Sequence, residues 1–148
     1  MTVVCTIGYE GLTAEEWIEL LKTNEIDVVV DVRDVPQSRK RGFSKSKLKE
    51  ALDTAGISYV HYGELGNPRK WRQDLNAGLD FRSFAKRFDG LMDQKADTLE
   101  DLYEGIQGKR ACLICYEEDP AACHRSLVAN RLRKAHPEDV EVEHLRHN

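Results

Sequence analysis

The sequence contains no apolar run close to the roughly 18 residues that a membrane-spanning helix requires. Its first residues, MTVVCTIGYEG, lack the basic segment and the small-residue cleavage site of a secretory signal. Cysteine is also scarce, with four residues in the chain. Without a secretory signal, these cysteines are expected to be thiols rather than a disulfide framework. The absences together favour a cytoplasmic protein with no membrane partner.

Two phosphate-binding motifs are absent as well. Neither GxGxxG nor GxxxxGK[ST] occurs, which excludes the standard dinucleotide site and the P-loop. The segment GYEG (8–11) has glycines suited to a tight turn, but this pattern alone is a weak signal. The sequence also shows no internal repeat, no low-complexity tract and no linker, so we expect a single domain over residues 1–148.

What the chain does contain is a balanced composition with local clusters of basic residues. Of its 148 residues, 41% are hydrophobic and 32% are charged, as in a small soluble domain with a real core. The net charge is −4, yet residues 35–49 include six basic residues and no acidic one, and RKWR (69–72) adds three more. Such clusters in an acidic protein suggest an anion, either a small molecule or nucleic acid, that is bound locally rather than along a continuous nucleic-acid face. For charge runs in general, however, a solvated loop is the more frequent explanation.

Short apolar runs alternate with helical patterns along the chain. The runs 3–7, 27–32, 57–62, 111–116 and 140–145 predict strands, and the last alternates with period two, as a half-exposed edge strand does. Helices are predicted after a capping box at Thr13 and Glu16, over 48–55 with a cap at Gly56, and over 81–92, 99–106 and 128–135. This order predicts a three-layer α/β fold with a mostly parallel, Rossmann-like sheet of about five strands.

Polar residues follow the predicted strands closely. In open parallel sheets, ligands bind outside the carboxyl ends of the strands, near the point where the strand order reverses. We therefore expect an anion-binding site at this edge. Its candidate residues are Gly8, Tyr9, Asp31, Arg33, Ser38, Arg39, Arg41, His61 and Arg125.

The segment CYEEDPAACHR (115–125) combines cysteine, histidine, carboxylates and arginine, and it allows three interpretations. A metal site would use Cys115, Cys123 and His124. However, Cys112 and Cys115 point to opposite faces of a strand, and the three remaining ligands lack the paired spacing of structural zinc, so no metal is assigned. A nucleophilic Cys123 would gain thiolate character at a helix N-terminus, although buried cysteines often only pack.

The third interpretation of this segment is an anion site, and it is the one we favour. A strand end followed by a helix start exposes backbone N–H groups, and Arg125 adds a cation. Glu117 and His124 would then transfer protons, or Glu117 would orient a neighbouring side chain.

Four segments in order, TIGYEG, DVRDVPQSRKRGFSKSKL, HYGELGNP and CYEEDPAACHRSLVANRL, resemble the bacterial and archaeal domain-of-unknown-function family 488. The resemblance covers nearly the whole chain and implies a compact α/β fold, without an established activity. It also marks motif positions, namely Asp31, Arg33, Pro36, Ser38, Phe43, Leu65, Gly66, Cys115, Glu117, Pro120, Cys123, His124 and Arg125. Asn67 stands where the family often has a second glycine, so a left-handed backbone is expected there.

The leading hypothesis is an enzyme that acts on a phosphorylated, nucleotide-like or nucleic-acid substrate, with hydrolysis as the candidate reaction. Its catalytic candidates are Glu117, Cys123 and His124, while Asp31 orients an arginine. One alternative is a non-catalytic module in which Trp71 or Phe43 stacks on a base and Arg125 pairs with Asp31. Another is a Cys/His metal-binding protein. Substrate, cofactor and oligomeric state are left open by the sequence.

Overall fold

The computed structural model describes residues 1–36, 38, 40–116 and 123–146. Within these ranges, one sheet has the strand order β3-β2-β4-β1-β5, and all of its pairings are parallel. The strands are β1 (Thr2–Gly8), β2 (Val28–Asp31), β3 (Ser58–His61), β4 (Arg110–Cys115) and β5 (Val140–His144). The predicted α/β fold and the five-stranded parallel sheet are confirmed.

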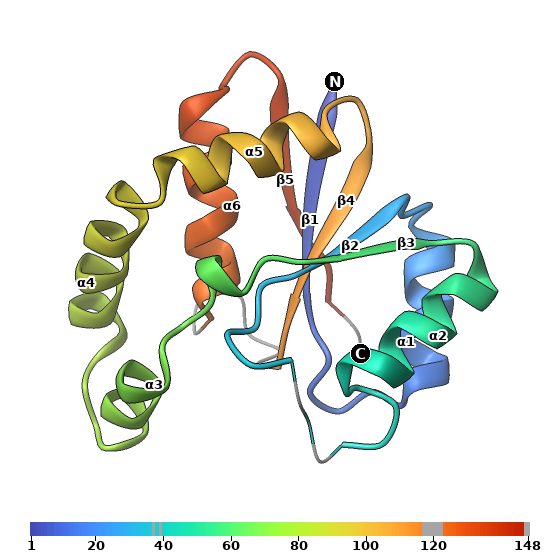
Figure 1. Cartoon of the computed structure of the whole chain (residues 1–148), viewed down its shortest axis with the longest axis horizontal. Coiled ribbons are helices and arrows are strands. Elements are labelled where there is room, and N and C mark those ends of the chain that lie inside the picture. Colours follow the sequence, from blue (N-terminus) through green and yellow to red (C-terminus); the bar gives the residue numbers. More distant parts are fainter. Residues whose placement is uncertain (37, 39, 117–122, 147–148) are drawn as a thin grey trace.

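Helices cover both faces of the sheet and complete three layers (Figure 1). On one face lie α1 (Ala14–Thr23) and α2 (Lys45–Ala55). On the other side lie α3 (Arg69–Asn76), α4 (Phe81–Asp93), α5 (Ala96–Ile106) and α6 (His124–Ala135), with the short turn η1 (Gly63–Leu65) before α3. None of the helices in the described ranges is long and apolar enough to cross a bilayer.

Burial explains why the strand sequences differ in pattern. β2 and β4 lie inside the sheet, and their residues face an apolar core on each side, so they read as continuous apolar runs. β5 lies at an edge, where Val140 is buried while Glu141 and Glu143 are exposed. The predicted half-exposed edge strand is therefore confirmed.

Two of the predicted helix ends have the expected geometry. The Thr13 side chain accepts from the Glu16 backbone N–H at 3.1 Å, and the Glu16 carboxylate accepts from the Thr13 N–H at 2.9 Å, which completes the capping box. Gly56 ends α2 with a φ of 76°, in the left-handed region that glycine adopts most easily. In contrast, α3 was not predicted, because its apolar face consists of only two residues, Trp71 and Leu75, within a helix of eight residues.

The strand order places a change of direction at the centre of the sheet. The helices that follow β1 and β2, namely α1 and α2, lie on one face of the sheet. The helix that follows β4, α6, lies on the opposite face. Where the connections of two neighbouring strands run over opposite faces of the sheet, a crevice forms at the carboxyl ends of those strands. The ends of β1, β2 and β4 therefore define the place to look for a ligand site.

Candidate functional site

A cavity of about 170 Å³ opens at the carboxyl ends of β1, β2 and β4, and we call it the rim pocket. The described residues that line it are Tyr9, Arg33, Asp34, Val35, Asn67, Arg72, Cys115, Tyr116 and His124. Pockets for drug-sized ligands usually measure about 300–1,000 Å³, and one water molecule occupies about 30 Å³ of liquid. The rim pocket thus has room for one small group, such as a phosphate or a carboxylate, with a few waters.

A larger hollow of about 480 Å³ lies between α1 and α2. Its lining consists of side chains from these two helices and Gly42, with no residue from a strand end. Because size alone does not identify a site, we regard the smaller rim pocket as the candidate, since it lies where the sheet topology gathers polar groups.

Asp31 and Arg33 form a buried ion pair beside the rim pocket. Nε and Nη2 of Arg33 donate to the two carboxylate oxygens of Asp31 at 2.8 and 2.7 Å, and the Tyr59 hydroxyl donates to Asp31 at 2.6 Å. Nη1 of Arg33 donates to the Phe43 carbonyl at 2.6 Å. Asp31 thus orients an arginine, as predicted, and its arginine partner is Arg33 rather than Arg125. Since most of its N–H groups are used inside the protein, Arg33 has little left to offer a ligand.

The same contacts control ionisation within this cluster. Burial acts to lower the pKa of Arg33, but the hydrogen bond and the negative charge of Asp31 outweigh it, and the pKa is raised. The pKa of Tyr59 is raised by burial and by its hydrogen bond to Asp31. Arg33 therefore stays charged and Tyr59 stays protonated near neutral pH.

Two residues of the rim pocket have polar groups that the protein itself does not use. The Arg72 side chain, on α3, forms no hydrogen bond or ion pair with any described residue. Asn67 is only 6% exposed, and its Oδ1 has no hydrogen-bond partner in the same part of the chain. Neither was among the predicted site residues, although the RKWR cluster was a signal for Arg72.

The left-handed backbone expected at Asn67 is wrong. Among the described residues other than glycine, only Glu25 has a positive φ. In this loop the backbone of Gly66, rather than that of Asn67, restricts the residue type. A Cβ at Gly66 would lie 2.4 Å from the backbone nitrogen of Asp34. Glycine is required there for close approach of two backbone segments, and this approach places Asn67 against the pocket.

The aromatic residues proposed for base stacking are occupied within the protein. Phe43 is fully buried and stacks on Tyr9, with ring centroids 4.3 Å apart, so its predicted stacking on a base is wrong. Trp71 packs partly against the core, and the Arg87 guanidinium lies over its ring at 5.4 Å. Tyr9 does line the rim pocket, as expected.

Several other predicted residues are not among the described residues that line the pocket. Gly8 is the last residue of β1 and pairs in register with Cys115. The Ser38 hydroxyl accepts from the Lys40 backbone, and His61 Nε2 donates to the Arg33 carbonyl at 2.8 Å. Arg41 is exposed beside the start of α1. Arg39, Glu117 and Pro120 lie outside the described residues, so their roles stay predictions.

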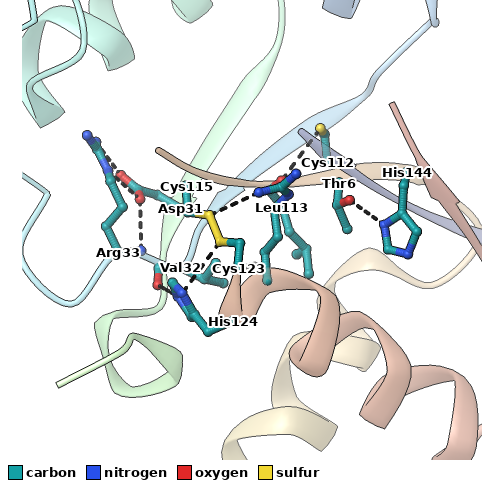
Figure 2. The surroundings of a disulfide bond; sticks show 11 residues. Thr6, Asp31, Val32, Arg33, Cys112, Leu113, Cys115, Cys123, His124 and His144 are labelled. Carbon is teal, nitrogen blue, oxygen red and sulfur yellow. Dashed lines mark hydrogen bonds and ion pairs between the residues drawn. A yellow bond between two sulfur atoms is a disulfide. The ribbon is translucent and has the colours of Figure 1, made fainter. Parts of the chain in front are cut away.

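Cys115 ends β4, and Cys123 is the N-cap residue of α6, as predicted (Figure 2). The structure joins them in a disulfide, so the expectation of four thiols is wrong for this pair. The reason is topological, because the strand end and the helix start bring together two residues that are eight positions apart. Cys112 packs in the α1/α2 core, on the face opposite Cys115, as predicted. In the disulfide, Cys123 has no thiolate to act as a nucleophile.

His124 is 7% exposed and is held by contacts on both ring nitrogens. Its Nε2 donates to the Val32 carbonyl at 2.7 Å, and its Nδ1 lies 3.7 Å from Cys123 Sγ. Burial lowers the pKa of His124 to about 4, and the positive charges of Arg125 and Arg72 act in the same direction. A neutral imidazole at pH 7 is a poor general acid. The predicted role of His124 in proton transfer stays a prediction.

Arg125 is not one of the described residues that line the rim pocket. Its side chain is fully buried, and Nη1 donates to Cys115 Sγ at 3.3 Å. The predicted contact between Arg125 and an anion stays a prediction. What the described residues do bring together are the three soft donors of Cys115, Cys123 and His124, whose ligand atoms lie within 4.8 Å of one another.

The cysteines at Cys5 and Cys112 are expected to resist thiol reagents in the native protein. Burial raises the pKa of the Cys5 thiol to about 11 and raises that of Cys112 well above its usual value, and the thiolate is the reactive form. Without a reductant, we expect slow labelling of native protein and rapid labelling of two thiols after denaturation, measured by absorbance of the released thiol chromophore. Rapid labelling of Cys112 in the native state would contradict the buried placement.

The family model described as domain of unknown function DUF488 matches residues 13–132, from the N-cap of α1 into α6. The match includes the carboxyl ends of β2 and β4 and nearly all residues that line the rim pocket. No curated protein sequence and no solved structure shows a significant match to the chain. Because the family match spans most of the 148 residues, the chain belongs to the domain of unknown function family DUF488.

Proposed function

We propose that the protein is an enzyme that holds a phosphate, or an anionic group of similar size, of its substrate in the rim pocket. One observation carries the proposal: the Arg72 guanidinium, which has no partner among the described residues, lines a cavity of about 170 Å³. The unpartnered Oδ1 of Asn67 can only accept a hydrogen bond, so it suits a hydroxyl or protonated oxygen of the ligand rather than the anion itself. The cavity lies at the strand ends, where parallel α/β sheets bind ligands. The size of the pocket implies that the rest of a nucleotide-like substrate lies outside it.

Charge balance identifies Arg72 as the anchor. The charge of Arg33 is matched by Asp31 at 2.7 Å, so the pair contributes little net attraction. Asp34 also lines the pocket and repels an anion that approaches its carboxylate. A guanidinium binds phosphate or carboxylate through two parallel hydrogen bonds, and Arg72 has its donors available for such a contact.

An enzyme fits the pocket better than a module that binds nucleic acid by stacking. Phe43 is buried in the core, and one face of Trp71 is covered by Arg87, so the aromatic contacts expected of a base-stacking surface are already used. Cys115 and His124, in contrast, form part of the pocket wall. A histidine and a redox-active cysteine pair beside an anion site are residue types from which a reaction centre can be built.

The test is calorimetric titration with inorganic phosphate at constant ionic strength. Arg72→Gln removes the guanidinium and is expected to weaken phosphate binding by about 10–100-fold, because a hydrogen bond to a charged group contributes about 1.5–3 kcal/mol. Arg69→Gln is the matched control, since Arg69 belongs to the same basic cluster and helix but is exposed and does not line the pocket. Equal affinities for Arg72→Gln and wild type would refute the anchor.

A second measurement addresses the reaction. Phosphate monoesters, phosphodiesters and nucleotides are incubated with the protein, and released phosphate or alcohol is quantified. For a turned-over compound, Arg72→Gln is expected to raise KM by a similar factor while Arg69→Gln leaves it unchanged. Phosphate binding without any turnover of such compounds would reduce the proposal to a binding protein.

A further inference from the structure

The wall of the rim pocket holds a cluster of donors suited to a soft metal ion. Cys115 and Cys123 are each 2% exposed and His124 is 7% exposed, and their ligand atoms all lie within 4.8 Å of one another. Figure 2 shows both sulfur atoms beside the imidazole ring, at the junction of β4 and α6. Two thiolates and an imidazole are ligands that select zinc over magnesium or calcium.

The backbone spacing at this junction is wide for a direct sulfur–sulfur bond. The Cα atoms of Cys115 and Cys123 are 7.4 Å apart, whereas disulfides usually have about 4.4–6.8 Å. Two thiolates on a tetrahedral zinc ion, each about 2.3 Å from the metal, have sulfurs about 3.8 Å apart. A bridging ion therefore suits the observed spacing of the two chain segments better than a covalent bond does.

His124 is already in the tautomer that a metal ligand needs. The Val32 carbonyl can only accept a hydrogen bond, so the 2.7 Å contact requires a proton on Nε2. In the neutral ring this leaves the lone pair on Nδ1, which lies 3.7 Å from Cys123 Sγ. Metal-binding histidines commonly donate their other N–H to a backbone carbonyl in this way.

The surroundings can support two thiolates. Arg125 Nη1 donates to Cys115 Sγ at 3.3 Å, which stabilises negative charge on that sulfur. The charge of Arg33 is matched by Asp31, so it does not add to the local positive charge. Two thiolates balance the charge of one divalent ion. In the pocket lining, the negative charge of Asp34 and the positive charge of Arg72 offset each other, so the lining adds no net charge through this pair.

We propose that the reduced protein binds one Zn²⁺ ion through Cys115, Cys123 and His124. The disulfide must first accept two electrons and two protons from a dithiol reductant, which becomes a disulfide itself, and Zn²⁺ then displaces both thiol protons. Three protein ligands leave a coordination position for water or substrate, as in catalytic zinc sites. Cys115 and His124 line the rim pocket, and the link between this ion and a substrate phosphate rests on the proposed function; the metal site itself does not.

The experiment uses the full chain, purified with a dithiol reductant that is removed anaerobically. Zinc titration against a chromogenic chelator is expected to show one tight site per chain, and Co²⁺ is expected to produce a thiolate charge-transfer band and tetrahedral d–d bands. Cys123→Ser is expected to weaken zinc binding by roughly 100-fold or more, since even the loss of an outer-shell partner costs about 10–100-fold. Cys112→Ala is the matched control, because Cys112 lies on the same strand but packs on its other face.

Three outcomes would overturn the metal site. Wild-type protein with both thiols free that takes up no zinc refutes it directly, and so does a Co²⁺ spectrum without thiolate bands. Equal zinc affinities for Cys123→Ser and Cys112→Ala would also refute the metal site. Circular dichroism shows whether each variant is folded. Phosphate titration of the zinc-free protein separates the metal site from the proposed anion site. If both proposals hold, Arg72→Gln weakens phosphate binding but still binds one zinc ion per chain.

Discussion

Replacing Asp31 with asparagine is expected to lower the free energy of unfolding by about 3–5 kcal/mol, the usual cost of removing one partner from a buried ion pair. Asp31 is fully buried and accepts hydrogen bonds from the Arg33 side chain, the Arg33 backbone and the Tyr59 hydroxyl. Asn keeps the shape but removes the charge, so the guanidinium of Arg33, 7% exposed, is left without its counter-ion. Urea denaturation followed by circular dichroism gives the difference.

Two controls separate the charge from its surroundings. Asp53→Asn makes the same chemical change on the exposed side of α2 and is expected to alter stability by less than about 0.5 kcal/mol. Tyr59→Phe removes one hydrogen bond to Asp31 and is expected to cost about 1 kcal/mol. If Asp31→Asn costs no more than Tyr59→Phe, the ion pair is not what stabilises this strand end.

Phe88→Ala is expected to destabilise the protein by a similar amount, about 3–5 kcal/mol, because it empties a large volume in a packed core. Phe88 is fully buried on α4, and its ring lies 5.7 Å from that of Phe84 and 5.6 Å from that of His124, measured between centroids. The variant also removes the aromatic edge that fixes the His124 ring, so zinc affinity should fall along with stability.

Phe81→Ala is the control on the same helix. Phe81 is only partly buried and contacts Phe84 rather than His124. Its truncation is expected to cost about 1 kcal/mol, in the middle of the range for point mutations, and to leave zinc affinity unchanged. Thermal unfolding and zinc titration on both variants test these expectations. A Phe88→Ala protein with wild-type zinc affinity would show that His124 is positioned without help from α4.

The architecture was predictable because the residues that form it follow strong local rules. Central strands appear as short β-branched runs, and the capping box at Thr13 and the glycine at Gly56 have their expected roles. α3 was not predicted because it is short, and the two apolar residues that it packs against the core, Trp71 and Leu75, are too few to form a recognisable periodic pattern. The predicted sheet topology, in turn, indicated the strand ends as the place to look for a candidate site.

The identity of the ligand-facing groups was less predictable, because it depends on which charges are already paired. Arg33 and Arg72 each have an aspartate two residues away in the sequence. Asp31 pairs with Arg33, whereas Asp74 pairs with Lys70 and Arg87 and leaves Arg72 without a carboxylate among the described residues. Spacing also did not reveal that Cys115 and Cys123 approach each other, since a separation of eight positions in the sequence is compatible with many distances in space. Asn67 was noticed for its backbone, whereas its side chain is the part that reaches the pocket.

The two edges of the sheet oppose self-association in different ways. Any edge strand offers unpaired backbone groups to a strand of another molecule, which is the first step toward aggregation. β5 carries exposed carboxylates at Glu141 and Glu143, and a second copy aligned along it would bring like charges together. β3 has no such charges and exposes Val60 by 39%, but it is only four residues long. Charge at one edge and brevity at the other therefore both disfavour extension of this sheet by a strand of another molecule.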